Sequence, residues 1–101
     1  MIDYEALIAK YCSGNTELLH IILTHSRQVA DRALTILDAH PQWVESGEID
    51  PVFIEEAAML HDIGVVLCDA PRIHCYGKHA YIEHGYLGAE ILRQEGLPKH
   101  A

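Results

Sequence analysis

The amino-acid sequence predicts an all-α fold. Apolar residues recur with the spacing of helices, Gly and Pro mark the ends of the periodic stretches, and no stretch alternates convincingly as a strand would. A length of 101 residues fits one domain with a modest core. We therefore expect residues 1–101 to form a single helical bundle, whose stability a bound metal or a second copy of the chain could increase.

Two helices are predicted in the N-terminal part of the chain. Residues 2–11 carry apolar side chains at helical spacing and end at a polar turn that contains Gly14. Asn15 or Thr16 can cap the next helix, over residues 17–39. A polar group in the middle of that stretch allows either one long helix or two shorter helices at an angle.

A proline marks the start of the third predicted helix. Pro41 ends the preceding helix, and residues 42–48 are expected to form an exposed loop. Asp50 then stands before Pro51, which is the favoured order of an N-cap and a first helical residue. We expect this helix to cover residues 52–60.

A loop and a fourth helix are predicted for the rest of the chain. Gly64 is placed to take a positive φ just past the third helix. Residues 65–80 show no sustained period, so we expect a functional loop that can include a turn of helix. Residues 81–95 return to helical spacing, and Gly96 suits the C′ position. Residues 97–101 resemble the entry to a further helix.

Composition restricts the partners and the compartment. Fifteen Asp and Glu residues against seven Lys and Arg give a net charge of −8. This charge repels nucleic-acid phosphates and anionic lipids, so neither a nucleic acid nor a membrane is expected as a partner. An odd number of cysteines and the lack of a signal-peptide pattern favour the cytoplasm. We expect one acidic cluster to be solvated surface: Glu45, Glu48, Asp50, Glu55 and Glu56.

Histidine is the unusual component of the sequence. The chain has eight histidines at scattered positions, and histidine is the commonest metal ligand. His61 and Asp62 follow an apolar helix and precede Gly64. A helix C-terminus carries partial negative charge, which favours a cation. Equally, the two residues could simply cap and solvate the helix end.

His25 changes this balance. It lies on or beside the buried stripe of its helix, because Ile22 precedes it and Val29 follows it at helical spacing. A lone histidine in such a position is usually a hydrogen-bonded core residue. Together with His61 and Asp62, a ligand role becomes the better interpretation.

Three segments in this order resemble a known family. They are THSRQVA at residues 24–30, EAAMLHDIG at residues 56–64 and HGYLGAEIL at residues 84–92. The chain resembles the HD-domain metal-dependent phosphohydrolases, and their HDIG subgroup, from about residue 16 onward. The resemblance implies an HD-domain-like helical bundle that binds a divalent metal between its helices.

The resemblance also implies the metal ligands. The family pattern is a His, a His-Asp pair and a distant closing Asp, and by position His25, His61 and Asp62 match the first three. Fe, Mn, Zn, Ni and Mg are not distinguished by this ligand set. The closing Asp has no match in the sequence. We therefore expect the chain to be the N-terminal portion of a longer domain, with loss of one ligand as the alternative.

His84 is the candidate ligand of a second ion. It resembles the extra histidine that two-metal members of the family place before a helix containing Gly and Ala. Two ions about 3.5–4 Å apart can hold both the attacking and the leaving oxygen of a displacement at phosphorus. The alternative is a surface histidine next to Gly85.

The loop allows two interpretations. Arg72 and Lys78 are expected to offer charge to a substrate phosphate, although solvated cations would give the same pattern. A zinc centre in the loop is the weaker interpretation, because the spacing fits no standard zinc motif. The four ligands of such a centre would be Cys68, His74, Cys75 and His79.

Together, these features predict a metal-dependent phosphohydrolase that acts on a small phosphate ester or nucleotide. Asp62 is the expected catalytic residue, because it could orient the attacking water as well as bind metal. Neither a Gly-rich phosphate loop nor a serine-nucleophile elbow is present. The alternatives are a catalytically silent binding or regulatory module and a di-iron oxygenase on the same scaffold.

Overall fold

A computed structural model describes residues 2–101 and confirms the predicted all-α class. The α-helices are α1 (Tyr4–Cys12), α2 (Thr16–Asp38), α3 (Pro41–Glu45), α4 (Pro51–Leu60) and α5 (His84–Gln94). The 3₁₀ helices are η1 (Ile63–Leu67), η2 (Pro71–Ile73), η3 (Tyr81–Glu83) and η4 (Pro98–His100), and the strands are β1 (Asp69–Ala70) and β2 (Cys75–Tyr76). Within residues 2–101, no helix combines the length and the apolar character needed to cross a membrane.

The helix starts follow from capping side chains. Asn15 caps α2, because its side-chain oxygen accepts a hydrogen bond from the backbone N–H of Leu18 at 3.2 Å. Asp50 caps α4 in the same way, and Pro51 is the first helical residue. α2 is one continuous helix, so the first of the two predicted arrangements is the one observed.

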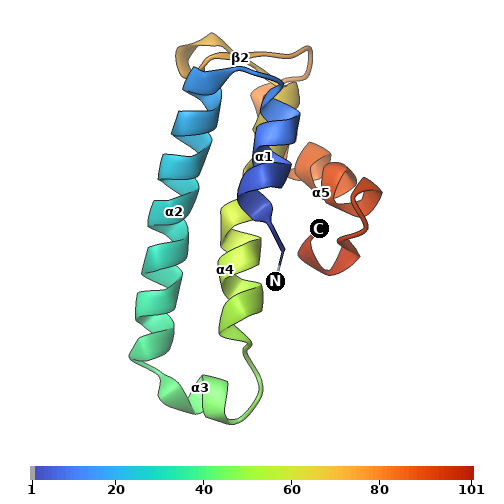
Figure 1. Ribbon diagram of the computed structural model, residues 1–101. Coiled ribbons are helices and arrows are strands. Elements are labelled where there is room, and N and C mark those ends of the chain that lie inside the picture. The colour runs from blue at the N-terminus through green and yellow to red at the C-terminus, as the bar shows by residue number, and fades with distance from the viewer. Residues whose placement is uncertain (1) are drawn as a thin grey trace.

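α2 and α4 lie side by side and run in opposite directions, joined at one end by α3 (Figure 1). α1 packs against both helices, and α5 packs on η1, the segment that continues α4. The core lies where these elements meet. Its buried residues are Ile8, Cys12, Leu18, Ile22, Leu60, Ile63, Val65, Cys75, Ile91 and Leu92.

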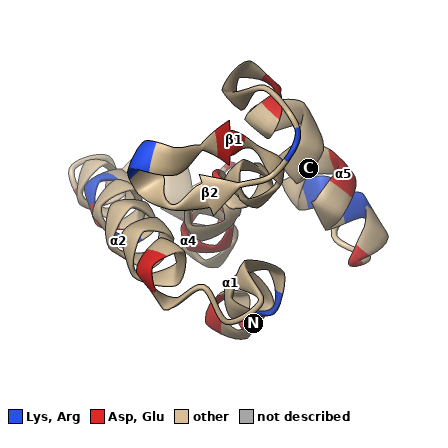
Figure 2. Ribbon diagram, turned by 90° about the horizontal axis from the view of Figure 1, so that it is seen from above, with Lys and Arg blue, Asp and Glu red and all other residues tan. Residues whose placement is uncertain are grey.

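Residues 65–80 were predicted as a functional loop that can include a turn of helix, and they contain such a turn, η2, within a small hairpin that was not predicted. β1 and β2 pair in antiparallel register, with Asp69 opposite Tyr76 and Ala70 opposite Cys75. Seen from above, the hairpin lies over the ends of α2 and α4 (Figure 2). These strands could not be predicted, because two residues are too few to show alternation.

Two further predictions of local structure are wrong. Residues 42–48 were expected as a loop, but α3 begins at Pro41, because a proline can start a helix as well as end one. Gly64 does not take a positive φ, whereas Gly96 does, as predicted. Gly64 lies within η1, where a Cβ atom would come within 1.9 Å of the carbonyl oxygen of His84. A close approach of backbones, rather than a helix cap, therefore accounts for this glycine.

Glu55 and Glu56 depart from the prediction that the acidic cluster is solvated. Glu55 accepts a hydrogen bond from the Tyr4 hydroxyl at 2.9 Å and forms an ion pair with Arg27 at 3.4 Å. Glu56 departs further. Its side chain is buried and accepts hydrogen bonds from the backbone N–H of Ile2 at 2.7 Å and from Nε2 of His100 at 3.1 Å. The ring of Phe53 lies against His100, with centroids 4.5 Å apart. Glu56 therefore joins segments near both ends of the described chain to α4.

Candidate metal centre

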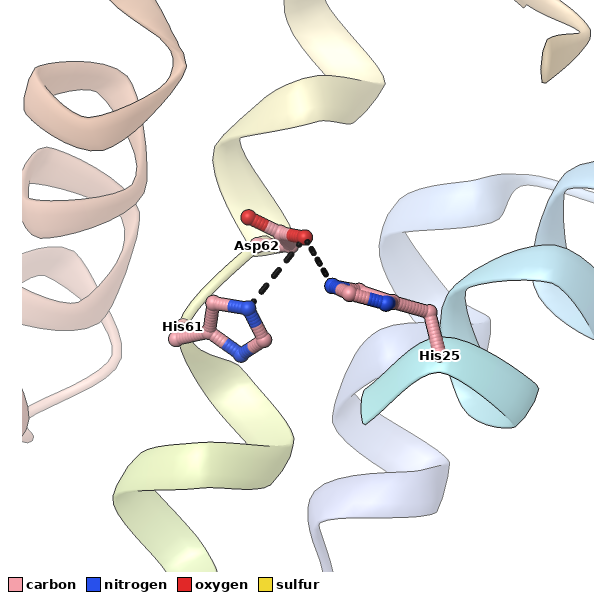
Figure 3. Close-up of side chains that lie close together, drawn as sticks. All are labelled: His25, His61 and Asp62. Carbon is pink, nitrogen blue, oxygen red and sulfur yellow. Dashed lines mark ion pairs between the residues drawn. The ribbon is translucent and has the colours of Figure 1, made fainter. Parts of the chain in front are cut away.

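His25, His61 and Asp62 come together between α2 and the end of α4 (Figure 3). Nε2 of His25 lies 3.2 Å from Oδ2 of Asp62, and Nε2 of His61 lies 3.3 Å from the same oxygen. One ligand atom from each residue can be chosen so that all lie within 4.8 Å of one another. His25 is on α2, while His61 and Asp62 lie between α4 and η1, so the packing of these elements creates the cluster.

His84 approaches the other oxygen of the same carboxylate. It is the first residue of α5, and its Nε2 lies 3.4 Å from Oδ1 of Asp62. The two oxygens of Asp62 therefore face different histidines: Oδ2 faces His25 and His61, and Oδ1 faces His84. Three imidazole rings thus present Nε2 to one carboxylate.

Backbone carbonyls orient two of these rings. Nδ1 of His61 lies 2.5 Å from the carbonyl oxygen of Ala58, and Nδ1 of His84 lies 2.7 Å from that of Tyr81. A carbonyl oxygen can only accept a hydrogen bond, so each Nδ1 carries a proton and donates it. In the neutral rings, Nε2 is then an unprotonated ligand atom, which is the arrangement that hydrogen bonds to metal-binding histidines usually enforce.

The electrostatics of the cluster favour a positive charge at its centre. An unprotonated Nε2 and a carboxylate oxygen repel each other at these distances unless a proton or a cation lies between them. In the metal-free protein a proton can take that place. The hydrogen bond with Asp62 raises the pKa of His61 against the opposing effect of burial, and the hydrogen bond from His61 lowers the pKa of Asp62. The donor set of imidazole nitrogens and one carboxylate fits a divalent transition metal.

The site is open to solvent on one side. The side chain of His25 is 52% exposed, and that of Asp62 is 21% exposed. His25 was predicted on or beside the buried stripe of its helix, and it lies beside that stripe and faces the cluster. Its exposure removes the interpretation of His25 as a satisfied core residue.

The cations and thiols predicted in the loop lie outside the cluster. Arg72 and Lys78 are exposed, and among residues 2–101 neither forms an ion pair, so their role in substrate binding stays a prediction. In the same part of the chain, the cluster of His25, His61 and Asp62 is the only close group of three possible metal ligands. The alternative zinc centre is therefore not assembled. Of its four proposed ligands, Cys68 and Cys75 are buried, whereas His74 and His79 are exposed.

Sequence reasoning missed the residues that hold the histidines in place. The carbonyl groups of Ala58 and Tyr81 each lie three residues before the histidine that they orient. The Tyr81 ring also stacks on the His84 ring, with centroids 4.6 Å apart. The three-residue spacing at a helical turn was the available signal, but it becomes meaningful only once the ring orientation is known.

The family model for the HD domain matches residues 22–100, which include every residue of this cluster. No curated protein and no solved structure shows a significant match to the chain. The match covers most of the sequence, and the fold is helical as this family requires. The chain therefore belongs to the HD domain family.

Proposed function

We propose that this protein is a metal-dependent phosphohydrolase that acts on a small phosphate ester or nucleotide. The observation that carries the proposal is the convergence of three imidazole Nε2 atoms on the carboxylate of Asp62. Membership of the HD domain family, whose members are generally metal-dependent hydrolases, supports the same reaction class.

Each residue of the cluster has a part in this function. His25 and His61, with Oδ2 of Asp62, would hold one divalent ion, and His84 with Oδ1 would contribute to a second position. A bound divalent metal polarises a phosphoryl oxygen and lowers the pKa of a coordinated water. Asp62 also orients that water, because its carboxylate lies at the centre of the cluster. The hydrogen bonds from Nδ1 of His61 and His84 hold both rings with Nε2 directed at Asp62, the position of the metal ions.

The overall charge is a further argument for a metal. The net charge of −8 repels a phosphate ester, so positive charge must be supplied locally. Divalent ions at the cluster would supply most of it. We propose that two further positive charges, those of Arg72 and Lys78, bind the substrate phosphate. Both residues belong to the hairpin segment, residues 68–79, which lies over the helix ends.

We also assign the chain to the HDIG subgroup of the family. The last two positions of the tetrapeptide at residues 61–64 have a packing role that supports this assignment. Ile63 is fully buried in the core, and Gly64 leaves room for the backbone of α5. Both residues therefore help to place the ligands on either side of them.

A catalytically silent HD-type module is the second candidate. In the described part of the chain, Asp62 is the only carboxylate of the cluster, and fewer acidic ligands weaken metal affinity. Such a module would use the same residues to bind metal or a phosphate ligand without turnover.

One experiment separates these functions. The purified protein is loaded in turn with Mn, Fe(II), Zn, Ni or Mg, and bound metal and phosphate release from small mono- and diesters are measured. We expect hydrolysis by the wild type and loss of both metal and hydrolysis in His61→Ala. His20→Ala is the matched control, because His20 is an exposed histidine of α2 outside the cluster. Turnover by metal-free His61→Ala would contradict the proposal, and metal binding without turnover would favour the silent module.

A further inference from the structure

A pocket of about 300 Å³ lies directly beside the cluster. His25 and Asp62 form part of its wall. One ligand could therefore place its phosphate at the metal centre and its organic group in the pocket. The rest of the wall is supplied by α2, η1, η2 and η3, and all of these side chains are apolar or aromatic. They are Ile21, Ile22, Val65, Ile73 and Tyr81.

The chemistry of this wall limits what can bind there. No Lys or Arg lines the pocket, and its only titratable groups besides the Tyr81 phenol are His25 and Asp62, which belong to the cluster. A second phosphate or a carboxylate would lose its hydration in the pocket without meeting a positive group. An apolar group, in contrast, would be removed from water against Ile21, Ile73 and the ring of Tyr81.

Size gives a second limit. Pockets that bind small molecules usually range from about 300 to 1,000 Å³, so this one is at the lower end. It suits a group about as large as one or two fused rings. A larger pocket of about 560 Å³ lies between the end of α1 and the hairpin, but none of the cluster residues contributes to it.

Tyr81 connects the pocket to the metal centre. Its carbonyl oxygen accepts the hydrogen bond from Nδ1 of His84, and its ring stacks on the His84 ring while it lines the pocket. A flat group bound beside Tyr81 would therefore contact a ring that itself contacts His84, whose Nε2 faces Oδ1 of Asp62. Aromatic side chains favour such flat partners through stacked or edge-on contacts.

From these observations we infer that the pocket binds the organic group of the substrate, and that this group is compact, uncharged and apolar or aromatic. The inference rests on the proposed function and narrows its substrate class. Of the two substrate classes in the proposed function, this inference keeps the small phosphate esters and excludes the nucleotides. Phosphate monoesters of small aromatic or alkyl alcohols fit the site, whereas polyphosphates and sugar phosphates do not. The phosphate lies at the cluster, and the ester oxygen lies at the mouth of the pocket.

The test uses phosphonates, which bind like phosphate esters but have a carbon–phosphorus bond that a phosphohydrolase does not cleave. Binding of phenylphosphonate and methylphosphonate to the metal-loaded wild-type protein is measured by calorimetry. We expect phenylphosphonate to bind at least tenfold more tightly. Equal affinities, or no binding of either compound, would overturn the inference, and this comparison needs no variant.

A pair of variants locates the binding position. Ile21→Trp adds bulk at the pocket wall, while Ile36→Trp makes the same change at a partly exposed position of the same helix outside the pocket. We expect Ile21→Trp to abolish the preference for phenylphosphonate with unchanged metal content and unchanged methylphosphonate affinity, and Ile36→Trp to have no effect. An unchanged preference in Ile21→Trp would place the phenyl group elsewhere and overturn the inference. If the preference holds but no phosphate ester is hydrolysed, the proposed function fails while the pocket assignment stands.

Discussion

Gly64 lies directly beneath the first turn of α5, where a Cβ atom would come within 1.9 Å of the carbonyl oxygen of His84. The same Cβ would lie 2.4 Å from the backbone nitrogen of Gly88, so two successive turns of α5 depend on this glycine. The contact that brings α5 onto η1 also brings Nε2 of His84 to within 3.4 Å of Asp62. Gly64 therefore determines where the third histidine of the cluster lies.

Substitution of Gly64 should disturb both stability and the position of His84. We expect Gly64→Ala to lower the free energy of unfolding by about 1–3 kcal/mol, the usual cost of overpacking, because two backbones must separate. Urea unfolding measures this loss. Metal analysis should show a lower metal content per chain, because α5 carries His84 away from Asp62.

Gly85 provides the matched control for this prediction. It is on the same helix next to His84, but a Cβ atom there would meet nothing within 4 Å. Gly85→Ala should raise stability by up to about 1 kcal/mol through helix propensity and leave metal binding unchanged. Equal unfolding midpoints for Gly64→Ala and the wild type would show that the close approach is not important.

The two oxygens of Asp62 should correspond to two separable metal positions. His25→Ala removes a nitrogen that faces Oδ2, whereas His84→Ala removes the nitrogen that faces Oδ1. We therefore expect His84→Ala to retain one ion per chain and His25→Ala to lose the ion beside Oδ2. Titration of metal-free protein followed by calorimetry gives the stoichiometry. If His84→Ala binds as many ions as the wild type, His84 is not a ligand.

The exposed cations of the hairpin segment should affect substrate binding rather than catalysis. We expect Arg72→Ala and Lys78→Ala each to raise KM for a phosphate ester by about 3–10-fold, the loss of one charge-assisted contact in a solvated position. The value of kcat and the metal content should not change. Lys99→Ala is the control, because Lys99 is an exposed cation on η4. Unchanged KM in both hairpin variants would show that these side chains are solvated cations.

Local signals in the sequence account for the four longer α-helices, α1, α2, α4 and α5, and for little else. Asn15 and Asp50 predicted the starts of α2 and α4 because a cap is formed within a few residues of the chain. Gly64 and Glu56 were misread because their partners lie far away in the sequence. Gly64 contacts the backbone of α5, and Glu56 accepts hydrogen bonds from Ile2 and His100. Periodicity in the sequence reveals neither of these long-range contacts.

The candidate site was predictable to a different extent. The resemblance to the HD family singled out His25, His61 and Asp62, and the fold brings these residues together. Ring orientation could not be predicted, because it depends on the carbonyl groups of Ala58 and Tyr81. Nor could the apolar pocket, because its wall combines side chains from four separate elements.

Glu56 should make the stability of the protein depend on pH in the acidic range. The hydrogen bond from the backbone N–H of Ile2, followed by that from His100, lowers the pKa of Glu56 below its usual 4.5 against the effect of burial. The folded state therefore favours the ionised carboxylate. Its stabilising contribution is complete above pH 4.5 and is lost as the pH falls through the lower pKa of the folded state.

Comparison of Glu56→Gln with the wild type isolates this contribution. Glutamine keeps the shape and one acceptor oxygen but not the charge, so we expect a loss of about 1–3 kcal/mol in the free energy of unfolding at neutral pH. Urea unfolding across the acidic range should show this difference shrinking below pH 4.5, because protonation makes the wild-type side chain neutral as well. Glu48→Gln changes an exposed carboxylate of the same acidic cluster and should alter stability little at any pH. A difference between the wild type and Glu56→Gln that stays constant through the acidic range would mean that the charge of Glu56 does not stabilise the fold.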